Sequence, residues 1–249
     1  MRVIAKLDVK PPHVVKPVHF EGLRKVGAPS DLAGRYYEQG ADEIFYMDIV
    51  ASLYQRQILL DEVAEAARTL LVPFAVGGGV RTIDDFSRLF HHGADKVVIN
   101  TGAVATPHII DAAARVFGGQ SVVLNIEAKQ LSAGKWTCYT DCGRIPSGLD
   151  VLEWVREAEG RGAGEILLQS VDADGRRRGF DLELVRSVVD AVRIPVVAAS
   201  GAGTLDHILE VAQQAAPSGI AVASMLHYGQ TDIGQIKQHL KDNGVEVAL

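Results

Sequence analysis

The chain has 249 residues, of which 47% are hydrophobic and 22% charged, a balance typical of globular proteins. Its formal net charge of −6 gives no basic field for nucleic acid, and no apolar run is long enough to span a membrane. The N-terminal residues show no secretion signal, so we expect a cytoplasmic protein that binds neither nucleic acid nor membrane. The two cysteines, Cys138 and Cys142, are too few for a disulfide framework or a typical metal site, and we expect no metal and no cofactor.

Short apolar segments alternate with longer amphipathic ones along the whole chain. The short segments, rich in Val, Ile and Leu, predict strands at 3–7, 43–47, 74–76, 96–99, 122–126, 165–168, 196–198 and 220–223. The longer segments predict helices at 29–39, 59–71, 83–91, 108–117, 151–161, 182–192, 205–215 and 233–240. Strict alternation implies parallel strands, and at this length it favours a (β/α)8 TIM barrel over an open doubly wound sheet.

An internal repeat supports the closed barrel. Residues 72–79 are echoed by 194–201, 41–45 by 163–167, and 82–84 by 204–206, always at the same offset (195 − 73 = 122). We therefore predict a single domain, residues 1–249, made of two half-barrels at about 1–119 and 120–249. The repeat also suggests a ligand with two similar ends.

Two carboxylates end matching strands of the predicted half-barrels. Asp8 follows the first strand and Glu127 follows the fifth. Because barrel active sites lie at the carboxyl ends of the strands, both side chains can face one mouth as a general acid–base pair. The structural alternative is that each pairs with a neighbouring lysine, Lys10 or Lys129.

Glycine-rich turns follow the third and seventh strands, and small polar residues follow the fourth and eighth. Backbone N–H groups in such turns can approach an anion. We predict two phosphate cups on opposite sides of the mouth, the first including Gly78, Gly79, Asn100 and Thr101, the second Gly201, Gly203, Ala223 and Ser224.

Charged residues of alternating sign begin four strands at the opposite end of the barrel: Arg2, Glu43, Lys96 and Glu165. They can form a ring of ion pairs across the barrel floor. The pattern alone leaves two interpretations open, a plug that stabilises the floor and a gated passage.

Over essentially its whole length, the chain resembles the cyclase subunit of imidazole glycerol phosphate synthase. The resemblance rests on 7–10, 40–43, 48–49, 76–79, 93–97, 126–129, 162–168 and 172–175. It implies a (β/α)8 barrel without a cofactor that takes ammonia from a separate glutaminase docked on its floor. It also implies conversion of a bis-phosphorylated ribulosyl formimino carboxamide ribotide to imidazole glycerol phosphate and aminoimidazole carboxamide ribotide.

The resemblance also implies roles for individual residues. Asp8 is one catalytic acid–base group, and Glu127 stands where the family has the second, an aspartate. The charges of the floor match an ammonia gate, and the partner is expected around Arg2, Asp95, Lys96 and Glu165. The family's phosphate-binding loops include Gly79, Asn100, Thr101, Asp174, Gly175, Gly201, Gly203, Ala223 and Ser224.

Some residues depart from the family. Lys6 replaces a small residue, usually cysteine, and the loop at 11–20 has prolines where glycines are usual. We expect Lys6 to point into the barrel and to pair with the longer Glu127. These departures suggest a paralogue that uses ammonia to amidate or amidinate an activated sugar for surface polysaccharide.

Four functions therefore compete: the histidine-pathway cyclase, the sugar-modifying paralogue, a single-chain sugar isomerase of the sister family, and a non-enzymatic scaffold. The charged floor argues against the isomerase, and the two retained carboxylates argue against the scaffold. The sequence leaves the first two open.

Overall fold

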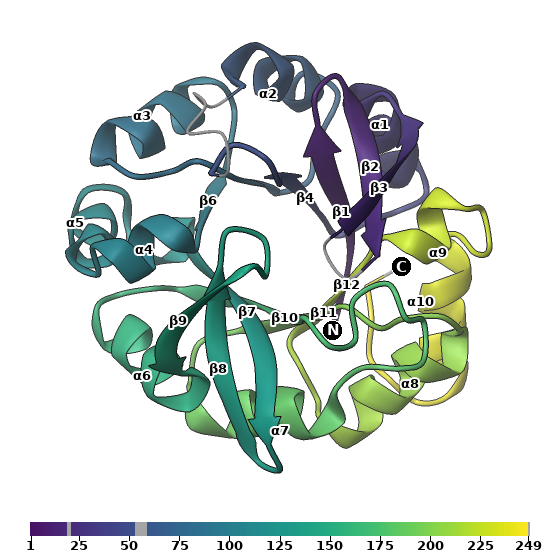
Figure 1. The fold of residues 1–249 in the computed structure, drawn as a ribbon. Helices are drawn as coiled ribbons and strands as arrows, with labels where there is room; N and C mark the ends of the chain where they lie inside the picture. The colour runs from purple at the N-terminus through teal and green to yellow at the C-terminus, as the bar shows by residue number, and fades with distance from the viewer. Residues whose placement is uncertain (19–20, 53–58, 249) are drawn as a thin grey trace.

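The structure is a computed structural model that describes residues 1–18, 21–52 and 59–248. Its centre is a closed ring of parallel strands enclosed by helices (Figure 1). The ring runs through β1 (Arg2–Lys10), β4 (Glu43–Asp48), β5 (Phe74–Gly77), β6 (Lys96–Ile99), β7 (Val122–Ser132), β10 (Glu165–Ser170), β11 (Val196–Ala199) and β12 (Gly219–Val222). Neighbours pair in parallel throughout, and β12 returns to β1. The predicted (β/α)8 barrel is confirmed, and its division into half-barrels stays an interpretation.

The helices cover the outside of the ring. They are α1 (Pro29–Glu38), α2 (Leu60–Ala67), α3 (Ile83–His91), α5 (His108–Phe117), α6 (Val151–Gly160), α7 (Leu182–Ala191), α8 (Leu205–Gln214) and α10 (Ile233–Asp242). Repeated residues have repeated roles, since Thr82 caps α3 and Thr204 caps α8, each hydroxyl accepting a backbone N–H at 3.2 Å. The helix predicted at 59–71 is shorter than expected and ends at Ala67.

Side-chain alternation along β1 separates two cores. Val3 and Leu7 pack in the outer core between strands and helices, whereas Ile4 packs in a smaller core inside the ring. Lys6 and Asp8 follow Ile4 at the two-residue spacing of a strand, so both lie inside the barrel. The sequence thus brings two charged side chains to the upper part of the barrel interior.

Two antiparallel hairpins interrupt the expected alternation. β1 is followed by β2 (His13–Val18) and β3 (Glu21–Gly27), and β7 by β8 (Lys135–Thr140) and β9 (Ile145–Asp150). Residues 13–18 are therefore a strand, not a loop as expected, while 19–20 lie outside the described residues. β1 and β7 run beyond the ring, and the hairpins satisfy the backbone groups that these extensions expose.

Short helices follow β6 and β12 at matching places. α4 (Thr101–Ala105) starts after Asn100, and α9 (Ser224–His227) starts after Ala223. The two preceding residues have nearly the same backbone angles, φ −132° and ψ −84° for Asn100 and φ −127° and ψ −79° for Ala223. A 3-10 turn, η1 (Gly119–Ser121), precedes β7. In the described part of the chain no helix is long and apolar enough to cross a membrane.

Candidate active site

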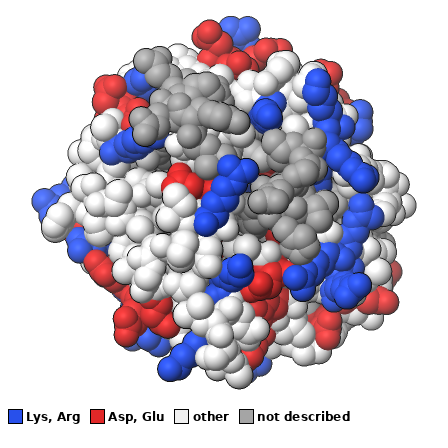
Figure 2. All heavy atoms as spheres, in the orientation of Figure 1, with Lys and Arg blue, Asp and Glu red and all other residues white. Residues whose placement is uncertain are grey.

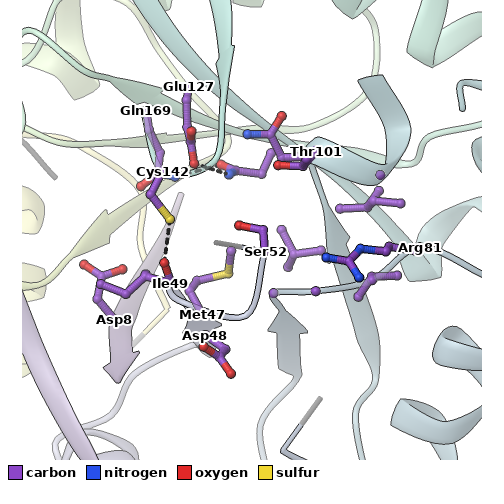
Figure 3. A pocket seen from close by; sticks show the side chains of 18 of the residues that line it. Asp8, Met47, Asp48, Ile49, Ser52, Arg81, Thr101, Glu127, Cys142 and Gln169 are labelled. Carbon is purple, nitrogen blue, oxygen red and sulfur yellow. Dashed lines mark hydrogen bonds between the residues drawn. The ribbon is translucent and has the colours of Figure 1, made fainter. Parts of the chain in front are cut away.

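Two cavities open at the carboxyl ends of the barrel strands. The first lies beside β4 to β7, and Asp8 and Glu127 both line it (Figure 3). The second lies beside β10 to β12. Lys6 and Gln169 line both cavities and therefore mark the boundary between them.

Asp8 is held by two ammonium groups. Lys6 Nζ bonds to Asp8 Oδ1, and Lys16 Nζ lies 3.6 Å from Asp8 Oδ2 and 3.4 Å from Asp174 Oδ1. All four side chains are buried. Burial alone would raise the pKa of Asp8, but the charges of Lys6 and Lys16 hold it below its ordinary value. Burial alone would lower the pKa of Lys16, but the carboxylates of Asp8 and Asp174 raise it above its ordinary value.

Glu127 has neutral partners. Its Oε2 accepts the backbone N–H of Gly143 at 2.7 Å, and its Oε1 accepts the Asn125 amide at 3.3 Å. Burial raises the pKa of Glu127 to about 7, although the Gly143 N–H and the charge of Lys6 act in the opposite direction. A carboxyl group with this pKa both gives and takes protons at neutral pH.

The expected pairing of Lys6 with Glu127 is wrong. Lys6 lies two residues from Asp8 on the same face of β1, so its ammonium group bonds to the Asp8 carboxylate instead. The alternative that Asp8 and Glu127 pair with their neighbouring lysines is also not found. Lys10 is exposed, and Lys129 stands over the Tyr139 ring with Nζ 5.5 Å from its centroid.

A chain of amides orients Glu127. Gln169 donates to Asn125 Oδ1 at 2.8 Å, and Asn125 in turn donates to Glu127. The turn between β8 and β9 closes over this group, because the Gly143 backbone N–H donates to Glu127. In the same turn, the Cys142 thiol donates to the Ile49 carbonyl at 2.7 Å (Figure 3). The turn therefore connects Glu127 of β7 with Ile49, which follows β4, across the first cavity.

The residues of the first predicted cup lie together. Gly78, Gly79, Asn100 and Thr101 all line the first cavity. Glycine is required at 78, where φ is +113° and a Cβ would lie 2.3 Å from the Asp48 carbonyl oxygen. The Asp48 carboxylate fixes the neighbouring turn by accepting the backbone N–H groups of Val50 and Ala51, both at 3.1 Å.

The second predicted cup is brought together except for one residue. Asp174, Gly175, Gly201, Ala223 and Ser224 line the second cavity. Gly203 lines neither cavity and instead packs so closely on Arg177 that a Cβ would lie 2.2 Å from its carbonyl oxygen. Gly203 therefore shapes the loop before α7.

Several residues that line the cavities are not predicted by the sequence. Lys16 lies in 11–20, where the sequence predicts a loop, but its strand β2 brings it to the mouth. Asn125 could have been found, since it lies two residues before Glu127 on the same inward face. Arg81, Arg177 and Cys142 come from turns, where the sequence gives no periodic signal.

The predicted floor ring is closed. Arg2 bonds Glu43 at 2.5 Å and also bonds Glu165, and Lys96 lies 2.8 Å from Glu43 and 2.7 Å from Glu165. Both glutamates are buried, and burial raises the pKa of Glu43. Nearby Asp95 accepts the Phe74 backbone N–H at 2.9 Å and is a structural part of the floor.

The rim of the mouth is basic on one side. Figure 2 shows Lys and Arg side chains gathered along the right-hand margin of this face, on the side of β3 and the loop before α7. Exposed members of these segments are Arg24, Lys25, Arg176, Arg177 and Arg178. This distribution attracts an anionic ligand even though the whole chain is acidic.

Comparisons with known proteins agree with this geometry. The sequence model of the family described as histidine biosynthesis protein matches residues 2–232. The chain is 47% identical over 246 residues to the imidazole glycerol phosphate synthase subunit HisF of Metallosphaera sedula, covering 99% of this chain and 98% of that protein. It is 48% identical over 246 residues to the protein of the same name from Myxococcus xanthus, covering 99% and 97%. For the one from Gluconacetobacter diazotrophicus the identity is 48% over 247 residues, covering 99% and 95%.

Proposed function

The chain belongs to the histidine biosynthesis protein family, and from this premise we propose that it is the cyclase subunit of imidazole glycerol phosphate synthase. In this reaction ammonia is combined with a bis-phosphorylated ribulosyl formimino carboxamide ribotide. The products are imidazole glycerol phosphate and aminoimidazole carboxamide ribotide. The observation that carries the proposal is the meeting of two cavities at a buried pair of carboxyl groups, Asp8 and Glu127.

The two cavities suit a substrate with a phosphate at each end. Gly78, Gly79, Asn100 and Thr101 would hold one phosphate, and Asp174, Gly175, Gly201, Ala223 and Ser224 would surround the other. Gly203 contributes by shaping the adjoining loop. The reacting centre then lies at the boundary between the cavities, beside Asp8 and Glu127, which we propose as the two catalytic carboxyl groups.

The barrel floor supports a route for ammonia. We propose that Arg2, Glu43, Lys96 and Glu165 form a gate that is closed in this structure. Above it, the interior core is apolar and includes small side chains such as Ala75, Ala199 and Ala221. Such a lining disfavours charged ammonium and admits neutral ammonia.

The partner would be a glutaminase that docks around this gate. Leu71 leaves 86% of its surface exposed on the floor, and Val72, Pro73 and Lys96 line the same shallow depression. An exposed apolar residue beside a charged ring is the pattern of a protein interface with an apolar centre. A cytoplasmic location for this complex is part of the proposal.

The sugar-modifying alternative is not favoured, because the full-length relatives carry the name of the histidine-pathway subunit. The test is complementation of a histidine auxotroph that lacks its own cyclase subunit, with a matching glutaminase supplied. Growth is expected from the unmodified chain and not from a Glu127→Gln control of equal abundance. Absence of growth with a folded, abundant chain and an active glutaminase would contradict the proposal.

A further inference from the structure

The two carboxyl groups of the active site have different direct contacts. Asp8 contacts ammonium groups at both oxygens, from Lys6 and Lys16. Glu127 contacts a backbone N–H and an amide and, in the described part of the chain, has no ion pair within 4 Å. Among these contacts Lys6 is the least expected residue, because it replaces a small residue of the family.

Lys6 has the geometry of an active-site residue. Only 6% of its surface is exposed, and it shares the inward face of β1 with Asp8. It lines both cavities, so its ammonium group lies where the reacting centre of a two-ended substrate would lie. A buried lysine is costly without a partner, and here the partner is the proposed catalytic carboxylate itself.

We propose that Lys6 is a positioning residue that keeps Asp8 an oriented carboxylate and thereby leaves proton transfer to Glu127. The inference rests on the proposed function for its reaction, but the ion pair can be tested without turnover. Asp8 then acts as a fixed negative charge beside the reacting centre, which stabilises positive charge that develops there. Glu127 exchanges protons with the substrate and is oriented by Asn125 and Gly143.

Other charged or titratable groups near Asp8 do not replace Lys6. They are Lys16 of β2, Glu127 of β7, Cys142 of the turn between β8 and β9, and His227 of α9. Burial lowers the pKa of His227 to about 4, so its ring is neutral at physiological pH. Burial raises the pKa of the Cys142 thiol, which stays protonated. Lys16 also bonds Asp174 and so divides its charge between two carboxylates.

The test compares Lys6→Met, which removes the charge, with Lys6→Arg, which keeps it. The control Lys10→Met removes an exposed charge from the same strand. The pH dependence of kcat/KM is measured with the ribotide at a constant concentration of free ammonia, because ammonium itself titrates. Lys6→Met is expected to lower kcat/KM at pH 7 by about tenfold or more and to move its acid limb to higher pH, since the Lys6 charge lowers the pKa of both Asp8 and Glu127. Lys6→Arg should keep the acid limb at its original pH, and the Lys10→Met control should keep the whole original profile.

A second measurement separates this inference from the proposed function. The carboxyl carbon of Asp8 is followed by ¹³C NMR in the unmodified chain and assigned with Asp8→Asn. Its signal is expected to remain that of an ionised group from pH 8 down to about pH 5, and to titrate at higher pH in Lys6→Met or, if that variant does not fold, in Lys6→Gln. Titration of Asp8 above pH 6 in the unmodified chain would overturn the inference, as would a variant that lowers turnover equally at every pH. A chain inactive on the ribotide would contradict only the proposed function.

Discussion

Asp8 and Glu127 line one cavity but have opposite pKa shifts, because ammonium groups surround the first and neutral N–H groups the second. Both side chains are buried, so desolvation opposes ionisation of each. Only at Asp8 do neighbouring charges outweigh that effect. The two carboxyl groups should therefore contribute to stability with opposite signs.

Glu127→Gln is expected to stabilise the chain at high pH. The pKa of Glu127 is raised from 4.5 to about 7, so the unfolded chain releases this proton at lower pH than the folded chain does. Stability is thus lost between about pH 4.5 and 7, and the loss above pH 7 is roughly 3 kcal/mol. Urea unfolding at pH 8 should show the variant more stable by up to this amount, and at pH 4 the difference should vanish.

Asp8→Asn is expected to destabilise the chain at high pH, the opposite of Glu127→Gln. The pKa of Asp8 is lowered, so its ionised form stabilises the fold above the unfolded pKa, and this contribution is lost as pH falls through the lower folded value. Removing the carboxylate leaves Lys6 buried without its partner, which costs about 3 kcal/mol. The same urea experiment at pH 8 should show destabilisation. Equal effects from both variants would contradict the assigned environments.

Turnover should depend on both carboxyl groups. With ammonium salts as the nitrogen source, Asp8→Asn and Glu127→Gln are each expected to lower kcat by about 100-fold or more, because an amide keeps the shape but not the charge or the proton chemistry. Rates are measured from the release of aminoimidazole carboxamide ribotide, with circular dichroism as the check on folding. A variant with nearly full turnover would make that residue structural.

The sequence predicted the barrel because two signals agreed. Alternating apolar segments located all eight ring strands, and the repeat at a fixed offset favoured a closed ring over an open sheet. The first hairpin was not predicted, because Pro11, Pro12 and Pro17 in and before β2 are typical of a loop. Lys16 was therefore absent from the predicted site, although it contacts Asp8.

The main error in the predicted site was the pairing of Lys6 with Glu127. Alternation along β1 correctly placed Lys6 inside the barrel, but it does not say which of two carboxylates a flexible lysine reaches. The raised pKa of Glu127 likewise depends on burial, which the sequence does not show. Glycine positions were more predictable, since Gly78 and Gly201 both have positive φ angles.

Phosphate should bind in both cavities. Crystals soaked in phosphate are expected to show one ion near Gly79, Asn100 and Thr101 and another near Gly201 and Ser224, contacted mostly by backbone N–H groups. In Gly201→Ala, a Cβ would lie 2.1 Å from the Gly179 carbonyl oxygen, so only the second ion should be lost. Ions found only on the outer surface would contradict a two-ended substrate.

The chain alone should release no glutamate from glutamine. A glutaminase needs a reactive thiolate, and burial raises the pKa of Cys138 to about 12. Burial also raises the pKa of Cys142, whose thiol is held by the Ile49 carbonyl. Incubation of the purified chain with glutamine, followed by enzymatic assay of glutamate, checks this. Glutamate production above that of a heat-inactivated sample would show that the chain makes its own ammonia.

The gate should govern how glutamine hydrolysis is coupled to synthesis. Lys96 bridges Glu43 and Glu165, so Lys96→Met leaves Arg2 as the one cation that the described residues provide between the two carboxylates. Because their repulsion then opens the ring, ammonia should escape at the subunit interface. In the complex with its glutaminase, the variant is expected to release clearly more than about one glutamate per imidazole product.

Turnover with ammonium salts should change little, because ammonia then reaches the site from solution. The exposed Lys135→Met is the control for loss of a positive charge. An unchanged ratio of glutamate to product in Lys96→Met would assign the ring to stabilisation of the barrel floor alone.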